Sequence, residues 1–281
     1  MVKKRQDDAG HAKPATYRTI DVADRDSVAY VTLNRSAVHN AFDEILIAEL
    51  TAALGVLDAS PRTRVVVLCG AGASFCAGAD LNWMRRVSAY TYEENLADAT
   101  ALAELLERLY ALSKPTIARV HGAAYGGGVG LIACCDIAIA VPDARFALSE
   151  AKLGLIPATI GPYVTEAVGP RHARRYFVTA ERFDAAEALR IGLVHEIVER
   201  DALDARIDQL LETLLQAGPQ AQAAAKSLVR AVAHRPIDRG VIADTAARIA
   251  TIRATEEGRE GVAAFLGRRP AAWIPPSRRG G

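Results

Sequence analysis

Hydrophobic and polar positions follow different patterns in the two parts of the chain. Up to residue 200, short β-branched runs alternate with stretches whose apolar residues recur at helical spacing. These patterns predict strands at 28–33, 64–68, 116–120, 136–140 and 193–198, and helices at 43–57, 96–112, 127–134 and 185–191. The stretch 82–95 is polar and only loosely patterned.

From residue 201 the strand pattern stops. Four alanine- and leucine-rich segments predict helices at about 202–216, 219–232, 239–255 and 257–266. Strands alternating with helices, followed by helices alone, predict an α/β core with an all-helical C-terminal region.

Composition narrows the class of protein. A chain of 281 residues that is 51% hydrophobic fits one large domain, or one domain and a subdomain, with a substantial core. The net charge of +1 argues against nucleic acid or a membrane surface as the main partner. No stretch approaches 18 uncharged apolar residues, so no membrane span is expected. Residues 1–15 are charged with mixed sign and predict a disordered N-terminal tail, not a signal peptide.

The four cysteines do not form a C-x-x-C pair, and two of them are neighbours in the chain. This spacing disfavours a disulfide framework and a zinc site. We expect reduced, mostly buried thiols in a cytoplasmic protein. The cysteines are Cys69, Cys76, Cys134 and Cys135.

Two glycine-rich turns and one glutamate are the strongest candidates for chemistry. The turns are 74–81 (SFCAGADL) and 126–130 (GGGVG), and the acid is Glu150. Bare-backbone turns can offer two N–H groups to one oxygen, and a carboxylate beside them can move a proton next to a polarised carbonyl. The structural alternatives are a glycine run that serves close helix packing and a Glu150 that only follows an N-cap, Ser149. The apolar surroundings of Glu150 would raise its proton affinity.

Two other interpretations of the glycines and histidines are weak. Gly70-Ala71-Gly72 follows a predicted strand, but Phe75 stands where a dinucleotide fingerprint needs its third glycine, and no phosphate-binding loop follows. No nucleophile elbow for a Ser-His-Asp triad is present. The histidines have no catalytic or metal-ligating partner at a recognisable spacing in the sequence. This favours structural roles for His39, His121, His172 and His195.

Several short motifs occur in a fixed order along the chain. Together they resemble the crotonase, or enoyl-CoA hydratase/isomerase, family over about residues 16–270. In appearance the chain is most similar to bacterial hydratases of methylglutaconyl-CoA or γ-carboxygeranoyl-CoA. The motifs are LNR at 33–35, HNAF at 39–42, FCAGADL at 75–81, KPTIA at 114–118, HGAAYGGG at 121–128, CDI at 135–137, FALSE at 146–150, LGLIP at 153–157 and AAEALRIGLV at 185–194.

This resemblance implies a fold and an assembly. The fold would be α/β, a spiral of ββα units over 16–200, followed by an α-helical trimerisation region over 201–281. The protein would associate as a homotrimer or as a dimer of trimers. It also implies an oxyanion hole made by the backbone N–H groups of Ala79 and Gly127, with Glu150 as the acid/base.

The resemblance further implies where coenzyme A (CoA) binds. The thioester substrate would contact the first loop (Ala77, Gly78, Ala79, Asp80 and Leu81), together with Ala41, Gly126, Gly127 and Gly130. Phe265 and Arg268 would lie near the CoA phosphates. Neither a metal nor a redox cofactor is implied, because CoA enters as part of the substrate.

One departure from the family pattern concerns function. Typical hydratases place two glutamates around one water; Glu150 matches the second, but Gly130 stands in the first slot. A hydratase of a branched or carboxylated 2-enoyl-CoA remains possible, with Gly130 facing the substrate and leaving room for a substrate carboxylate. A Δ3,Δ2-enoyl-CoA isomerase needs only one base. A non-catalytic acyl-CoA-binding homologue is the third hypothesis, against which the presence of Glu150 argues.

Overall fold

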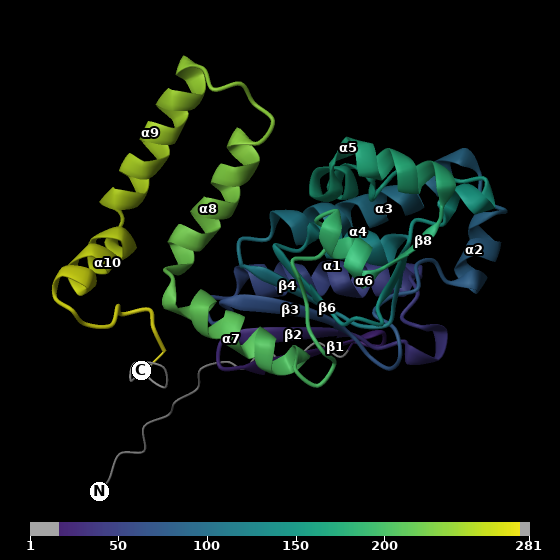
Figure 1. Cartoon of the computed structure of the whole chain (residues 1–281), viewed down its shortest axis with the longest axis horizontal. Helices are drawn as coiled ribbons and strands as arrows, with labels where there is room; N and C mark the ends of the chain where they lie inside the picture. The colour runs from purple at the N-terminus through teal and green to yellow at the C-terminus, as the bar shows by residue number, and fades with distance from the viewer. Residues whose placement is uncertain (1–16, 276–281) are drawn as a thin grey trace, which may run out of the picture.

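Two β-sheets form the centre of the molecule. A computed structural model describes residues 17–275 (Figure 1). In the larger sheet β1 and β2 form an antiparallel hairpin, and the other strands pair in parallel. Its order is β1 (Ile20–Arg25), β2 (Val28–Leu33), β3 (Val65–Gly70), β4 (Thr116–Val120), β6 (Ile137–Ala140) and β9 (Glu196–Ile197). The smaller sheet has the order β5 (Ala123–Tyr125), β7 (Arg145–Ala147) and β8 (Arg182–Asp184).

The chain passes from the larger to the smaller sheet at sharp corners. β4 runs into β5 through Gly122, and β6 runs into β7 through residues 141–144. Gly122 has a φ of +61°, and a Cβ there would lie 2.0 Å from the carbonyl oxygen of Ala73, so only glycine fits. Successive strand pairs therefore give one strand to each sheet. The predicted α/β fold class with its ββα spiral is confirmed.

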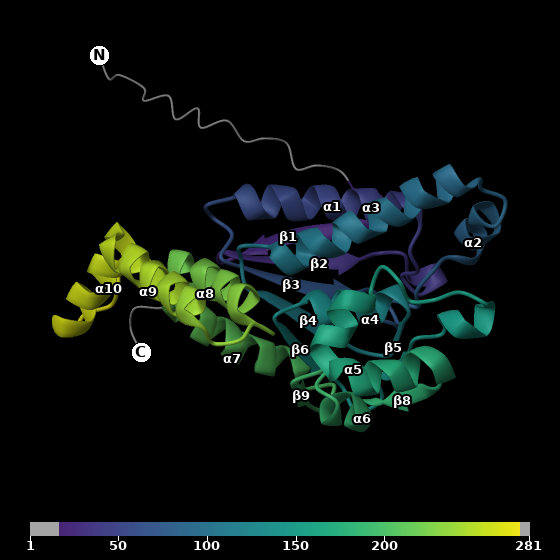
Figure 2. The ribbon, with the colours of Figure 1, turned by 90° about the horizontal axis from the view of Figure 1, so that it is seen from above.

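Helices cover both faces of the larger sheet. α1 (Glu44–Ala59) and α3 (Tyr92–Ala111) lie on one face and α7 (Leu203–Gln216) on the other (Figure 2). α1 buries Leu46, Leu50 and Leu54 in the core, and Asp43 caps its start by accepting a 2.8 Å hydrogen bond from the Leu46 N–H. The remaining helices of the core are α2 (Leu81–Val87), α4 (Gly127–Cys134), α5 (Gly161–Thr179) and α6 (Ala185–Arg190), with 3-10 turns at Ser36–Val38 and Glu150–Leu153.

The last three helices project away from this core (Figure 1). They are α8 (Pro219–Val232), α9 (Arg239–Ala254) and α10 (Glu256–Leu266), which confirms the predicted helical C-terminal region. α8 buries none of its residues. It is held to the core by Lys226, whose Nζ donates to the Lys114 carbonyl (2.8 Å) and to Asp136 (2.7 Å).

Several features differ from the sequence-based predictions or lie outside them. Six elements were not predicted: β1, β5, β7, β8, α2 and α5. Of these, α2 begins just before the loosely patterned stretch 82–95. The strand predicted at 193–198 shrinks to Glu196–Ile197. The four cysteines are buried and free, as predicted. Between residues 17 and 275 no helix is long and apolar enough to cross a membrane. The predicted tail at 1–15 lies outside the described residues.

Candidate active site

Three parallel segments end at one edge of the smaller sheet. β5 and β7 pair in parallel, with Tyr125 opposite Ala147. The segment after β3 joins β5 on its other side, where the Cys76 N–H donates to the Ala123 carbonyl (3.1 Å) and the Tyr125 N–H donates to the Cys76 carbonyl (2.9 Å). Carboxyl ends of parallel strands meet at the same edge of a sheet. The residues that follow each segment are therefore brought together: Gly78-Ala79, Gly126-Gly127 and Ser149-Glu150.

The backbone N–H of Ala79 is free to bind a ligand. On one side of its segment, the Phe42 N–H donates to the Gly78 carbonyl (2.6 Å) and the Asp80 N–H donates to the Phe42 carbonyl (2.8 Å). Because N–H groups alternate in direction along a strand, the Ala79 N–H points away from Phe42, toward the side where β5 lies. Within residues 17–275 it has no hydrogen-bond acceptor, and Ala79 is exposed.

The N–H of Gly127 is a second free donor. The preceding N–H, of Gly126, is used by the Ala147 carbonyl (2.9 Å). Gly127 is the first residue of α4, and its N–H finds no acceptor in the described part of the chain. N–H groups in the first turn of a helix lack partners within the helix, and the helix dipole there favours negative charge. The arrangement suits an oxygen that gains negative charge.

Glycine is required at both loops because they touch. Gly126 has a φ of +48°, and a Cβ there would lie 3.0 Å from Oε1 of Glu150 and 4.0 Å from the Cα of Gly78. A Cβ on Gly127 would lie 2.6 Å from the Phe42 ring. Side chains at these positions would push the loops and the carboxylate apart. The glycine run therefore serves both interpretations, because glycine at 126 lets Glu150 approach and glycine at 127 makes room for the Phe42 ring.

Glu150 is the acid that the structure places beside the two free donors. It opens the 3-10 turn Glu150–Leu153, and Ser149 makes no side-chain cap bond. Oε2 of Glu150 is buried and has no hydrogen-bond partner among the described residues. Burial raises the pKa of the Glu150 carboxyl above its ordinary value. A carboxylate with raised proton affinity suits general acid/base work near neutral pH.

The space expected beside Gly130 is not open. Gly130 lies one helical turn after Gly126, and its N–H donates to the Gly126 carbonyl (3.2 Å). A Cβ at position 130 would lie 2.3 Å from Cγ2 of Ile160 and 3.6 Å from Cδ2 of Leu106. The expectation that Gly130 leaves room for a substrate carboxylate therefore does not hold in this structure, because Ile160 fills the place.

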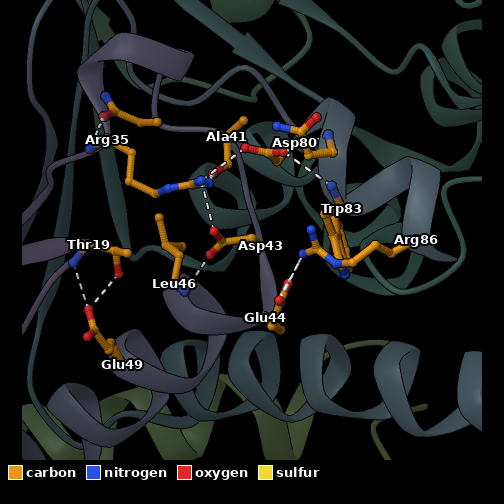
Figure 3. A network of polar contacts seen from close by, with 12 residues as sticks. Thr19, Arg35, Ala41, Asp43, Glu44, Leu46, Glu49, Asp80, Trp83 and Arg86 are labelled. Atoms are coloured by element: carbon orange, nitrogen blue, oxygen red, sulfur yellow. Dashed lines mark hydrogen bonds and ion pairs between the residues drawn. The ribbon is translucent and has the colours of Figure 1, made fainter.

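An ion-pair network that the sequence analysis did not assign holds the first loop (Figure 3). The Arg35 guanidinium binds Asp43 (2.8 Å) and Asp80 (2.9 Å) and donates to the Ala41 carbonyl. Asp80 also accepts from the N–H groups of Asn82 (2.8 Å) and Trp83 (3.2 Å), which makes it the N-cap of α2. Burial alone would raise the pKa of Asp80, but the bonds from Trp83, Asn82 and Arg35 lower it below its ordinary value. Asp80 and Ala41, both predicted to bind CoA, thus have structural partners; contact with CoA stays a prediction.

Asn40 holds the segment that leads into this loop. It is fully buried, and its side-chain amide donates to the carbonyls of Ala71 (2.8 Å), Ser74 (2.8 Å) and Phe75 (3.2 Å). Its Oδ1 accepts from the Arg35 N–H (2.9 Å). The only signal for Asn40 and Arg35 in the sequence was their place in two of the ordered motifs.

The predicted CoA contacts in the C-terminal region lie elsewhere. Phe265 is 82% exposed on α10, and Arg268 follows that helix. In both views α10 lies at the opposite end of the molecule from α2, and Figure 2 shows β5 on the side of α2 (Figures 1 and 2). Within one chain the structure does not bring Phe265 or Arg268 to the site. Leu81, in contrast, is an exposed residue two positions after Ala79.

Three of the four histidines expected to have structural roles have polar partners among the described residues. Nδ1 of His39 lies 3.0 Å from Oγ of Ser74, and His121 and His195 meet the backbone. Nε2 of His121 lies 2.9 Å from the Gly72 carbonyl, and Nδ1 of His195 accepts from the Ala138 N–H (3.0 Å). Between residues 17 and 275 no three metal-ligating side chains gather into a candidate metal site.

Two free amide donors beside a buried carboxylate define a site that can polarise a carbonyl and move a proton next to it.

Comparison with known proteins identifies a family whose members carry out chemistry of this kind. The enoyl-CoA hydratase/isomerase family model matches residues 23–275. A crotonyl-CoA hydratase of Syntrophomonas wolfei is 32% identical over 260 residues, which cover 92% of this chain and 98% of that protein.

Solved structures show the same fold. An enoyl-CoA hydratase from Shewanella pealeana has a TM-score of 0.89 and 46% identity, over 91% of this chain and 96% of that chain. An enoyl-CoA hydratase/isomerase from Marinobacter aquaeolei has a TM-score of 0.87 and 33% identity, over 92% and 99%. The chain belongs to the enoyl-CoA hydratase/isomerase family. The predictions of the crotonase family and of an enzyme are thereby confirmed; the resemblance to methylglutaconyl-CoA hydratases stays a prediction.

Proposed function

We propose that this protein is an enoyl-CoA hydratase that adds water to a 2-enoyl-CoA thioester. The observation that carries the proposal is the shared edge of three parallel segments, where the free N–H groups of Ala79 and Gly127 lie close to the buried carboxylate of Glu150. Family membership and the names of the relatives support the same substrate class.

The residues divide the reaction between them. The thioester oxygen accepts hydrogen bonds from Ala79 and Gly127, which stabilise the negative charge that develops as the enolate forms. Glu150 takes a proton from a water molecule while the oxygen of that water bonds to C3 of the substrate. The protonated Glu150 then returns that proton to C2, so one water is added across the double bond and the enzyme is regenerated. The raised pKa of Glu150 favours this return.

The CoA portion would bind along the first loop. Ala77, Gly78, Asp80 and Leu81 flank Ala79 there, and CoA would be the only non-protein group involved, as part of the substrate. Phe265 lies on α10, and Arg268 follows that helix, at the end of the molecule opposite α2 (Figure 1). They could therefore contact CoA only at the glycine-rich loops of a second copy of the chain. The apolar exposed residues of α9 and α10 support such self-association, as trimers or dimers of trimers.

A second candidate activity is Δ3,Δ2-enoyl-CoA isomerisation. The specific observation in its favour is the single acid: position 130 carries no carboxylate and its space is filled by Ile160. An isomerase needs one base that takes a proton from C2 and returns it to C4. The same oxyanion hole would stabilise the dienolate formed in between.

Side-by-side assays of the pure protein decide between these activities. The substrates are crotonyl-CoA, a 3-enoyl-CoA and 3-methylglutaconyl-CoA, and the Glu150→Gln variant is the matched control. Hydration of crotonyl-CoA or 3-methylglutaconyl-CoA that exceeds isomerisation supports the hydratase and tells an unbranched from a branched, carboxylated substrate. Faster conversion of the 3-enoyl-CoA favours the isomerase. Tight binding of all three esters without turnover would make the protein a non-catalytic acyl-CoA binder.

A further inference from the structure

We infer that Ile160 is a positioning residue: its side chain occupies the place that a side chain at position 130 would take, and this limits the site to the single carboxylate of Glu150. The catalytic part of this inference rests on the proposed function, whereas its packing part does not.

Position 130 lies one helical turn from the residues around Glu150. The Gly130 N–H donates to the carbonyl of Gly126, the N-cap of α4 (3.2 Å). A Cβ on Gly126 would lie 3.0 Å from Oε1 of Glu150. One turn of an α-helix rises about 5.4 Å, so a long side chain at position 130 would start within reach of this carboxylate.

Ile160 fills the space beside position 130. It lies ten positions after Glu150, at the end of the loop that leads into α5, and it is 2% exposed. A Cβ on residue 130 would lie 2.3 Å from its Cγ2 and 2.9 Å from its Cβ, distances that real atoms do not tolerate. The Val164 N–H donates to the Ile160 carbonyl (3.0 Å), so the backbone that carries Ile160 is fixed by α5. A side chain at position 130 requires Ile160 to shift, so glycine at 130 fits isoleucine at 160 best.

The chemical consequence concerns the proton transfers. Ile160 places hydrocarbon where a second acid would have to enter, and Oε2 of Glu150 is left without a polar partner in the described part of the chain. One carboxylate must then act first as base and afterwards as acid. Removing Ile160 should make room for a second carboxylate at position 130 that can share these steps.

The packing part is tested by thermal unfolding of the full-length protein. Gly130→Ala should lower Tm by roughly 2–10 °C with Ile160 in place, because overpacking a core is destabilising. The same change in an Ile160→Gly background should lower Tm little or even raise it. Ile160→Val is the matched control, since valine keeps the branching methyl groups and should not relieve the clash. An equal effect of Gly130→Ala in all three backgrounds would overturn the inference.

The catalytic part compares Gly130→Glu with and without Ile160→Gly. With Ile160 present the glutamate should lower both Tm and turnover. The double variant should hydrate crotonyl-CoA at least about tenfold faster than Ile160→Gly alone, and the pH profile of kcat should gain a second ionisation. A folded double variant with neither gain would show that position 130 does not serve the reaction. If the native protein turns over no acyl-CoA ester while the Tm values still couple, the proposed function fails and the packing inference stands.

Discussion

The side chain of Glu150 suits catalysis but lowers the stability of the folded protein at neutral pH. Oε2 of its carboxylate is buried, and burial raises the pKa of the group. A group whose pKa is higher in the folded state binds protons more tightly there. The folded protein therefore loses stability as pH rises from the ordinary pKa of a glutamate through the raised value. At neutral pH the charged Glu150 costs stability that an uncharged residue of the same shape would not cost.

We accordingly expect Glu150→Gln to be inactive and more stable at pH 7. Turnover should fall by about 10²–10⁴-fold, because the amide cannot move the proton, while binding of a CoA ester changes little. Unfolding measured at pH 5 and pH 8 should show a smaller loss of stability with pH in the variant than in the native protein. Retention of more than about a tenth of the activity would exclude Glu150 as the acid/base.

The same shift sets the pH dependence of the reaction. As the base, Glu150 must begin deprotonated, so kcat/KM should fall on the acid side as the carboxyl takes up a proton. Because burial raises its pKa, the midpoint of this acid limb should lie above 4.5, the ordinary value for glutamate. Initial rates across a pH series in one buffer of constant ionic strength measure it. A midpoint at or below 4.5 would contradict the burial of Oε2 of Glu150 as the cause of a raised pKa.

The Ala79 amide offers a separate test of the oxyanion hole. Ala79→Pro removes an N–H that has no acceptor within residues 17–275, so no internal hydrogen bond is lost. Loss of one such donor typically lowers kcat by about 10²–10³-fold. Ala79→Ser keeps the N–H at the same exposed position and serves as the control. Circular dichroism of both variants checks folding; a folded and fully active proline variant would remove Ala79 from the oxyanion hole.

At the scale of elements, Arg35 ties three segments to one another. Its side chain is 18% exposed, and it binds Asp43 before α1, Asp80 before α2 and the carbonyl of Ala41, two residues before Asp43. Replacing it leaves two nearly buried carboxylates without a counter-charge. Asp80 directly follows Ala79 in the chain, so its ion pair with Arg35 holds the loop that carries Ala79 (Figure 3).

We expect Arg35→Met to reduce the free energy of unfolding by about 3–5 kcal/mol. Arg35→Lys should lie between the two, because lysine keeps the charge but cannot bind both carboxylates with a planar fork. Urea titrations of the native protein and the two variants measure this difference. We also expect kcat to fall in the variants, because the loop that carries Ala79 becomes less ordered. A methionine variant as stable as the native protein would show that the network adds nothing to the fold.

The elements also show what the sequence could predict. Strands β2 and β4 and helix α4 match their predicted bounds, because buried β-branched runs and a glycine-started apolar helix are local signals. α5 was missed because Gly169 and Pro170 interrupt its pattern, and the structure carries the helix across a kink at Gly169. β5 has three residues, and only its neighbours make it a strand. Glu150, Ala79 and Gly127 were found from motifs, whereas Ile160 depends on a contact between α4 and a distant loop, which no local pattern records.

At the scale of the whole molecule, the helical end has a small core of its own in the described part of the chain, made of Ala264, Ala271 and Ile274. α9 buries only Val241, and α10 only Ala264. Ile242 and Ile249 are seven residues apart, so they share one exposed face of α9. α10 exposes a similar stripe, made of Val262, Phe265 and Leu266. Exposed apolar faces of this extent mark sites of protein association.

The combined change Ile242→Glu and Ile249→Glu should therefore dissociate the protein. The native protein should behave in light scattering as a multiple of the 30.0 kDa chain, and the variant should approach one chain. Val56→Glu, an equally apolar-to-acidic change on exposed α1, is the control and should leave the assembly intact. If Phe265 and Arg268 reach CoA from a second copy, dissociation should raise KM for crotonyl-CoA more than it lowers kcat, because Ala79, Gly127 and Glu150 come from a single chain. A native protein of 30.0 kDa would contradict self-association, and an unchanged KM in the dissociated variant would exclude Phe265 and Arg268 from CoA binding.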